Sequence, residues 1–89
     1  MAKSVILIST PNCGKCKMLY QSLKSYCQRK DIPMEKIDYE NLPENIQEDV
    51  VKSNHKSVPI LYLITDEYNY VFGGDNAFLD LKQFLMDNK

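Results

Sequence analysis

The sequence has 89 residues with 11 basic and 12 acidic side chains, so its formal net charge is −1. This length allows one domain with a single core, which we expect to span residues 1–89. The balanced charge favours neither a nucleic acid nor an anionic membrane as a partner, and the early apolar run at residues 5–8 is too short for a signal peptide or a membrane span. Three cysteines do not fit a secreted disulfide scaffold, so we expect a cytoplasmic protein.

The first half of the chain predicts a strand, a helix and a second strand. Residues 4–9 form an apolar run that is typical of a strand covered on both faces. Residues 17–29 predict a helix, and residues 34–38 predict a second short strand. A strand–helix–strand unit of this length is expected to be parallel and right-handed. The apolar stripe of the helix consists of Cys16, Leu19, Tyr20, Leu23, Tyr26 and Cys27.

A second helix is predicted over residues 43–53. Asn41 can cap its start, Glu44 follows three residues later, and Pro43 is tolerated in a first turn. Its inward positions are expected to be Ile46, Val50 and Val51.

Two strands and a last helix complete the predicted order. Residues 60–64 have the strongest β-propensity in the chain, and residues 70–72 are long enough for an antiparallel return strand. Asp75 or Asn76 is expected to cap the last helix. Its apolar positions are Phe78, Leu79, Leu81, Phe84 and Leu85. The order β-α-β-α-β-β-α predicts an α/β fold with a mixed four-stranded sheet and helices on both faces.

Cys13 and Cys16 form a Cys-x-x-Cys motif where the first predicted strand ends and the first predicted helix begins. Unpaired backbone N–H groups and the helix dipole favour a negative charge there. Such a position can lower the pKa of a thiol from about 8.5 to roughly 3.5–7.5, and the thiolate is the species that attacks disulfides. We therefore expect Cys13 to be the nucleophile and Cys16, one turn further on, to be the resolving thiol.

Half of a zinc site is the alternative interpretation of this pair. A structural zinc ion takes four nitrogen or sulfur ligands, and the remaining candidates are Cys27 and His55. Cys27 lies on the apolar stripe of the first helix, where a cysteine behaves as a small core residue. No second Cys-x-x-Cys motif is present in the sequence. Redox chemistry without a metal is therefore the prediction.

Two later motifs give the Cys pair a context. Val58-Pro59 opens the third predicted strand, and Gly73-Gly74-Asp75 precedes the last predicted helix. With these motifs the whole chain resembles the thioredoxin superfamily and, within it, the small dithiol glutaredoxins. The resemblance implies the thioredoxin fold and a monomeric, glutathione-linked thiol–disulfide oxidoreductase. It implies glutathione as the reductant, no metal, and protein disulfides as substrates, ribonucleotide reductase among them.

The resemblance also implies roles for individual residues. The Val58–Pro59 bond would be cis and face the nucleophile, with the Val58 backbone pairing with an extended substrate. Gly73, Gly74 and Asp75 would hold the γ-glutamyl end of glutathione, and Asp75 would receive its ammonium group. Lys56 would lie near the glycyl carboxylate of glutathione. Each of these segments also has an ordinary structural reading as a strand start, a capped turn or a solvated lysine.

Three positions depart from the glutaredoxin pattern. Thr10 stands where a lysine is common, and Gly14 and Lys15 replace the usual proline and aromatic residue inside the motif. Lys15 would favour the Cys13 thiolate, while the missing aromatic ring removes one wall of the glutathione groove. Two alternatives stay open: a thioredoxin-like electron donor recycled by thioredoxin reductase, although the sequence has no tryptophan, and an iron–sulfur cluster bridged between two subunits, which Gly14 would permit.

Overall fold

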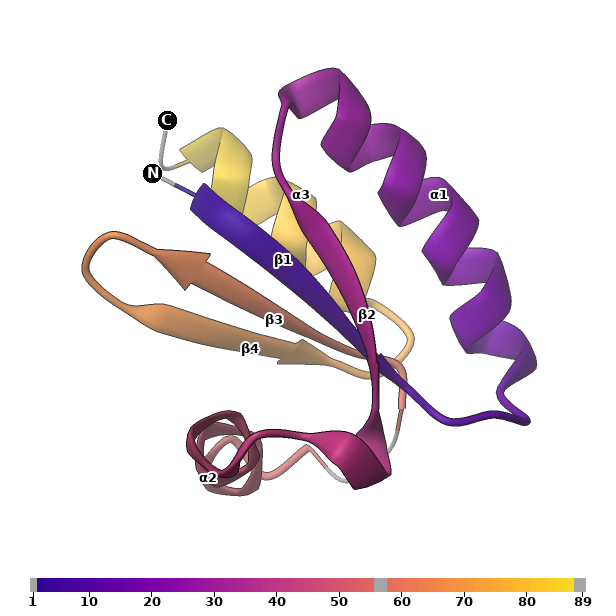
Figure 1. Ribbon diagram of the computed structural model, residues 1–89. Helices are drawn as coiled ribbons and strands as arrows, with labels where there is room; N and C mark the ends of the chain where they lie inside the picture. Colours follow the sequence, from indigo (N-terminus) through magenta and orange to yellow (C-terminus); the bar gives the residue numbers. More distant parts are fainter. Residues whose placement is uncertain (1, 56–57, 88–89) are drawn as a thin grey trace.

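Four strands form one mixed sheet in the order β2-β1-β3-β4 (Figure 1). The computed structural model describes residues 2–55 and 58–87. Its strands are β1 (Ala2–Ser9), β2 (Met34–Asp38), β3 (Ile60–Thr65) and β4 (Asn69–Gly73). β1 pairs with β2 in parallel and with β3 antiparallel, and β3 pairs with β4 antiparallel. The predicted mixed sheet of four strands is therefore confirmed.

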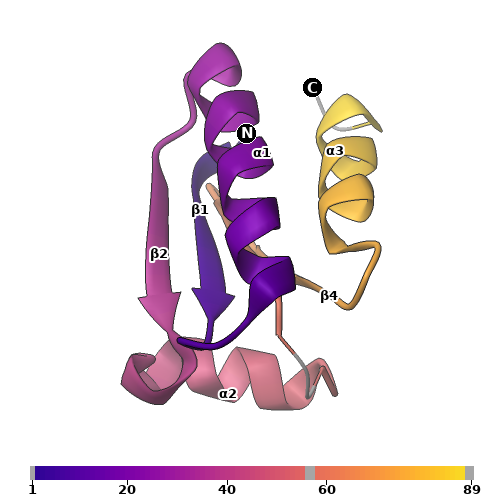
Figure 2. The same ribbon diagram turned by 90° about the vertical axis from the view of Figure 1, so that its right-hand side faces the viewer.

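Within the described residues, three α-helices cover the two faces of this sheet. They are α1 (Gly14–Lys30), α2 (Glu44–Lys52) and α3 (Ala77–Asp87), and a short 3-10 helix (Tyr39–Asn41) precedes α2. α1 and α3 lie side by side on one face, whereas α2 crosses the opposite face near the end of the strands (Figures 1 and 2). The predicted helices on both faces are confirmed. None of the helices in the described residues is long and apolar enough to cross a membrane.

The alternating side chains of β1 build two separate cores. Val5 and Leu7 point to the face of α1 and α3, where they join Leu23, Cys27 and Leu81. The other side chains point to the opposite core. Its buried members are Ile6, Ile8, Ile46, Val50, Ile60 and Tyr62. The central strands are thus covered on both faces, as the continuous apolar run of β1 predicts.

The start of α2 differs from the prediction. Asn41 ends the 3-10 helix and does not cap α2, which begins at Glu44 after Pro43. Leu42 is extended, with ψ 134°. A residue before proline is disfavoured in the helical region, so α2 cannot begin before Pro43. Asp38 caps the preceding 3-10 helix instead, because its carboxylate accepts the N–H of Glu40 at 3.0 Å.

Two side chains expected to face inward are exposed. Val51 is 65% exposed and Leu79 is 60% exposed. In α2 the buried positions are Ile46 and Val50, four residues apart, and in α3 they are Ala77 and Leu81. A spacing of four keeps each pair on one narrow stripe, which the adjoining residues do not share.

Tyr62 is only 1% exposed and connects β3 to α2 through its hydroxyl. Its hydroxyl donates to a carboxylate oxygen of Asp49 and accepts a hydrogen bond from the amide of Asn69 at 2.9 Å. Burial, followed by the hydrogen bond to Asp49, raises the pKa of Tyr62 to about 12. The folded state therefore holds the phenolic proton more tightly than an unfolded chain does.

Replacing Tyr62 with phenylalanine tests this connection. We expect Tyr62→Phe to lower the free energy of unfolding by about 1–2 kcal/mol, because Asp49 and Asn69 lose a shared partner. The contribution of this proton to stability is present below pH 10.0 and is lost as the pH rises toward about 12. Tyrosinate absorbance in the wild type should therefore show a late ionisation step that Tyr62→Phe lacks. Identical titration curves for the two proteins would contradict the assignment.

Candidate functional site

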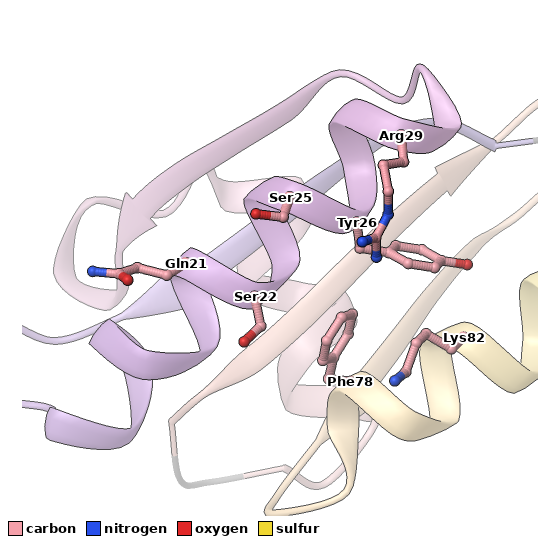
Figure 3. A pocket seen from close by; sticks show the side chains of 7 residues that line it. All are labelled: Gln21, Ser22, Ser25, Tyr26, Arg29, Phe78 and Lys82. Carbon is pink, nitrogen blue, oxygen red and sulfur yellow. The ribbon is translucent and has the colours of Figure 1, made fainter.

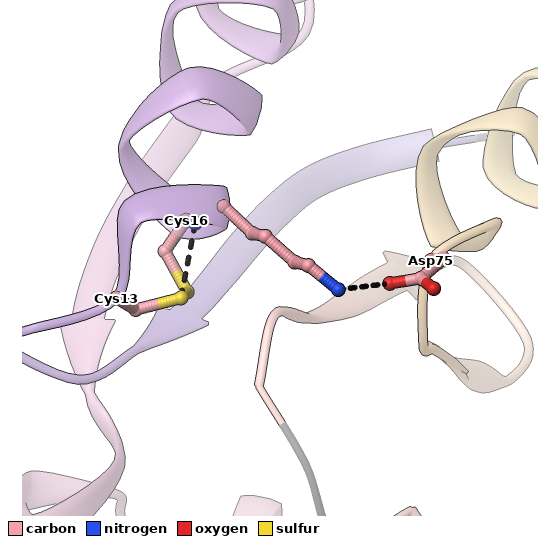
Figure 4. The surroundings of a disulfide bond; sticks show 4 residues. Cys13, Cys16 and Asp75 are labelled. Carbon is pink, nitrogen blue, oxygen red and sulfur yellow. Dashed lines mark hydrogen bonds and ion pairs between the residues drawn. A yellow bond between two sulfur atoms is a disulfide. The ribbon is translucent and has the colours of Figure 1, made fainter.

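Cys13 and Cys16 are joined by a disulfide at the start of α1 (Figure 4). α1 begins at Gly14, three residues earlier than predicted, so Cys13 is its N-cap residue. The backbone N–H of Cys16 donates to Cys13 Sγ at 3.0 Å. Cys13 is half-buried and Cys16 is 1% exposed. The two sulfur atoms are therefore unequal: one lies at the surface end of the helix and the other is covered.

A cavity of about 320 Å³ lies against both cysteines. Lys17 and Lys36 bring two cationic side chains to its wall, and Asp38 brings one carboxylate. The remaining lining residues are Ser9, Thr10 and Pro11. Lys36 and Asp38 belong to β2, which runs parallel to β1 and ends at the same edge. No local sequence pattern connects these two residues with the cysteines; the parallel register does, because it places Asp38 opposite Ser9.

The sheet register brings the Val58-Pro59 segment to the same end of the molecule. Ile60, the first residue of β3, pairs with Ile8 near the end of β1. Cys13, the N-cap of α1, follows Ile8 by five residues. The Val58–Pro59 peptide bond is cis, as the resemblance implies. Pro59 is buried and Val58 is half-buried. Lys56, the other residue expected in this segment, lies outside the described residues.

The Gly73-Gly74-Asp75 segment reaches this end through β4. Gly73 pairs with Ile60, so it is the next position across the sheet from the start of β3. Gly74 has φ +85°, a left-handed conformation that favours glycine. α3 begins directly after Asn76, whose carbonyl oxygen accepts the N–H of Asp80 at 2.8 Å. The structure thus gathers the three predicted segments at one edge of the sheet.

Lys15 joins two of these segments directly. Its Nζ lies 2.9 Å from Oδ1 of Asp75, although 60 positions separate the two residues in the sequence. Gly14 and Lys15 are both exposed in the first turn of α1. The cation expected beside Cys13 is therefore present, but its ammonium pairs with Asp75 in the loop before α3. Sequence spacing alone gives no signal of this pairing.

His55, which the sequence suggests only as a candidate zinc ligand, contacts the Gly73 segment. A Cβ atom added to Gly73 would lie 2.5 Å from both Cγ and Nδ1 of His55. The imidazole therefore packs directly on the Gly73 backbone and fixes the loop after α2 against the end of β4. This contact leaves no room for a side chain at Gly73, which explains the glycine there without any ligand.

The zinc alternative finds no set of ligands in the described part of the chain. Cys27 is buried in the core, and burial raises the pKa of its thiol. Within residues 2–55 and 58–87, no three histidine, cysteine, aspartate or glutamate side chains gather closely enough to hold a metal ion. Cys27 is thus a core residue, as predicted.

A second cavity, of about 440 Å³, lies between α1 and α3 (Figure 3). Tyr26 and Phe78 form its aromatic wall, with ring centroids 5.6 Å apart in an edge-to-face arrangement. Lys82 Nζ lies 4.5 Å from the centroid of the Phe78 ring. The other lining residues are Gln21, Ser22, Ser25 and Arg29. This cavity shares no lining residue with the one at the disulfide. Its lining comes from α1 and α3 alone, so it is the groove between these two packed helices.

The contact between His55 and Gly73 predicts a stability effect. We expect Gly73→Ala to lower the free energy of unfolding by about 1–3 kcal/mol, because the imidazole must move. The loss should shrink when His55→Ala is also present. Gly14→Ala is a matched control, since an added Cβ there meets no atom within 4 Å. Urea unfolding of Gly73→Ala, His55→Ala, the double variant and Gly14→Ala measures these free energies. If Gly73→Ala lowers the free energy of unfolding equally with and without His55, the contact is contradicted.

Comparison with known proteins identifies the fold. No protein-family model matches the sequence, and a search of curated proteins finds no match. Among solved structures, thioredoxin O1 from Arabidopsis thaliana in its oxidized state gives a TM-score of 0.68 at 19% identity, covering 97% of this chain and 77% of that protein. Thioredoxin 1 from Thermosipho africanus TCF52B gives 0.67 at 18% identity, covering 97% and 99%. Fasciola hepatica thioredoxin gives 0.68 at 18% identity, covering 96% and 79%.

At these identities the likeness concerns the fold, and it does not separate a glutaredoxin from a thioredoxin. The expectation of a glutaredoxin therefore stays a prediction. The chain has the thioredoxin fold, with a Cys-x-x-Cys pair at the start of its first helix.

Proposed function

We propose that this protein is a thiol–disulfide oxidoreductase that works through Cys13 and Cys16. The observation that carries the proposal is the unequal burial of two sulfur atoms that already form a disulfide at a helix start. Cys13, the less buried one, accepts the N–H of Cys16, and the same N–H would stabilise a thiolate in the reduced protein. Lys17 and Lys36, which line the adjoining cavity, add positive charge near that thiolate.

The proposed cycle consists of two exchanges. The Cys13 thiolate attacks one sulfur of a substrate disulfide, forms a mixed disulfide with it, and releases the other sulfur as a thiolate that takes a proton from water. Cys16 then loses its proton and attacks Cys13 Sγ, which releases the substrate as a second thiolate and leaves the Cys13–Cys16 disulfide. The substrate gains two electrons and the protein loses two.

Glutathione is the reductant that we propose for the return step. One glutathione thiolate opens the Cys13–Cys16 disulfide, and a second one releases glutathione disulfide and restores the dithiol. The exposed residues Gly74, Asp75 and Asn76 before α3 support this proposal, because the N-terminus of a helix favours a carboxylate. The half-buried Val58 at the cis bond offers backbone groups to an extended substrate.

Serine substitutions separate the roles of the two cysteines. We expect Cys13→Ser to abolish reduction of a glutathionylated peptide, since the nucleophile is lost. Cys16→Ser should keep part of that activity, because glutathione can resolve the mixed disulfide from solution. Cys27→Ala is the matched control and should retain activity, as its thiol is buried away from the pair. Equal loss in Cys13→Ser and Cys16→Ser would contradict the proposed roles.

Parallel coupled assays identify the reductant. With NADPH, glutathione reductase and glutathione, we expect steady turnover of a glutathionylated peptide, followed as loss of NADPH absorbance. The same protein is assayed beside it with NADPH and thioredoxin reductase in place of the glutathione system. Turnover with thioredoxin reductase alone would replace glutathione as the reductant and leave the dithiol chemistry intact.

A further inference from the structure

The Lys15–Asp75 ion pair begins inside the cysteine motif, between the two residues that the proposed function makes reactive. Lys15 is two residues after Cys13 in the first turn of α1, and Asp75 belongs to the loop between β4 and α3. The ammonium and the carboxylate are 2.9 Å apart, and their side chains are 72% and 78% exposed. The lysine side chain therefore connects the cysteine motif to the loop before α3.

Asp75 has the chemistry to bind a cationic group of a substrate. Its carboxylate is exposed and would form a charge-assisted hydrogen bond with an ammonium ion. In this structure the ammonium that it binds belongs to the protein itself. A substrate with a free amino group near its reacting sulfur must displace Lys15 before it can use Asp75. A substrate without such a group binds with the same affinity whether or not the Lys15–Asp75 pair is formed.

We propose that Lys15 is a specificity-determining residue, which competes for Asp75 with the amino group of small thiol substrates. This inference rests on the proposed function, in which Cys13 exchanges with disulfides. The closed pair disfavours amine-bearing small disulfides, such as glutathione disulfide, relative to extended peptide disulfides without a nearby ammonium. The substrate class that the site favours is therefore the peptide disulfide.

The exposure of the pair limits the size of this effect. Solvent and salt screen exposed ion pairs, whose measured strengths correspond to about a twofold to fivefold change in an equilibrium constant. Competition can reduce the affinity for an ammonium by no more than this factor. The proposed effect is thus a moderate preference, and glutathione at high concentration would still act as a reductant.

An equilibrium measurement isolates the competition from turnover. In a Cys16→Ser variant, Cys13 exchanges with glutathione disulfide to give the Cys13–glutathione mixed disulfide and free glutathione. Mass spectrometry gives the equilibrium constant from the fraction of modified protein. The same measurement with N-acetylglutathione disulfide provides a probe that has no ammonium. Any effect of a substitution on the Cys13 thiolate itself applies to both probes and cancels in the ratio of the two constants.

Adding Lys15→Met should raise the ratio of the glutathione constant to the N-acetylglutathione constant about twofold to fivefold. Asp75→Asn should remove that gain when it is combined with Lys15→Met. Lys24→Met is the matched control, because it removes one exposed positive charge from α1 away from the disulfide cavity and leaves the Lys15–Asp75 pair in place; the ratio should not change. High salt should reduce the effect of Lys15→Met.

Two further results would overturn the inference. One is an unchanged ratio in Lys15→Met, and the other is a gain that persists after Asp75→Asn. A failure of the proposed function looks different, because the coupled assay with the glutathionylated peptide would then show no turnover that depends on Cys13, whatever the ratio of the two constants.

Discussion

The hydrogen bond from the Cys16 N–H to Cys13 Sγ is the interaction on which the proposed chemistry depends. It exists because Cys13 is the N-cap of α1, where the first N–H groups of the helix have no carbonyl partner within it. A sulfur atom in that position is held toward solvent, while its neighbour one turn further is covered by the core. Local helix geometry thus gives two identical side chains different environments.

The sheet register brings the other segments of the site to the cysteine pair. Ile8 pairs with Ile60, and Ile60 pairs with Gly73, so three segments that are far apart in sequence end at the same edge. The disulfide follows the first segment, the cis bond precedes the second, and the Gly74–Asp75 turn follows the third. Lys15 then connects the first segment to the third through Asp75. Any shift of register by one residue would separate these parts and reverse the faces of the strands.

Periodicity predicts the order of the elements and the mixed sheet, and the Cys-x-x-Cys motif at the start of the first helix predicts the reactive pair. The thioredoxin fold is predicted by the resemblance. The apolar run of β1 and the stripe of α1 are strong signals, because burial on two faces and on one helical face requires them. The predicted cap of α2 was wrong because Pro43 holds Leu42 in an extended conformation. The predicted burial of Val51 and Leu79 was wrong because these short helices bury a narrower stripe than their apolar composition indicates. The Lys15–Asp75 pair and the His55–Gly73 contact depend on side-chain directions across the fold, which no local pattern encodes.

Titration of Cys13 tests the central claim most directly. The double variant Cys16→Ser/Cys27→Ala retains Cys13 as its single cysteine, since the sequence contains three. Its ultraviolet thiolate absorbance can therefore be followed against pH without contributions from other thiols. Stabilisation at the N-cap of α1 predicts a pKa clearly below the free-thiol value of about 8.5. A pKa at or above that value would show that the helix start does not activate Cys13.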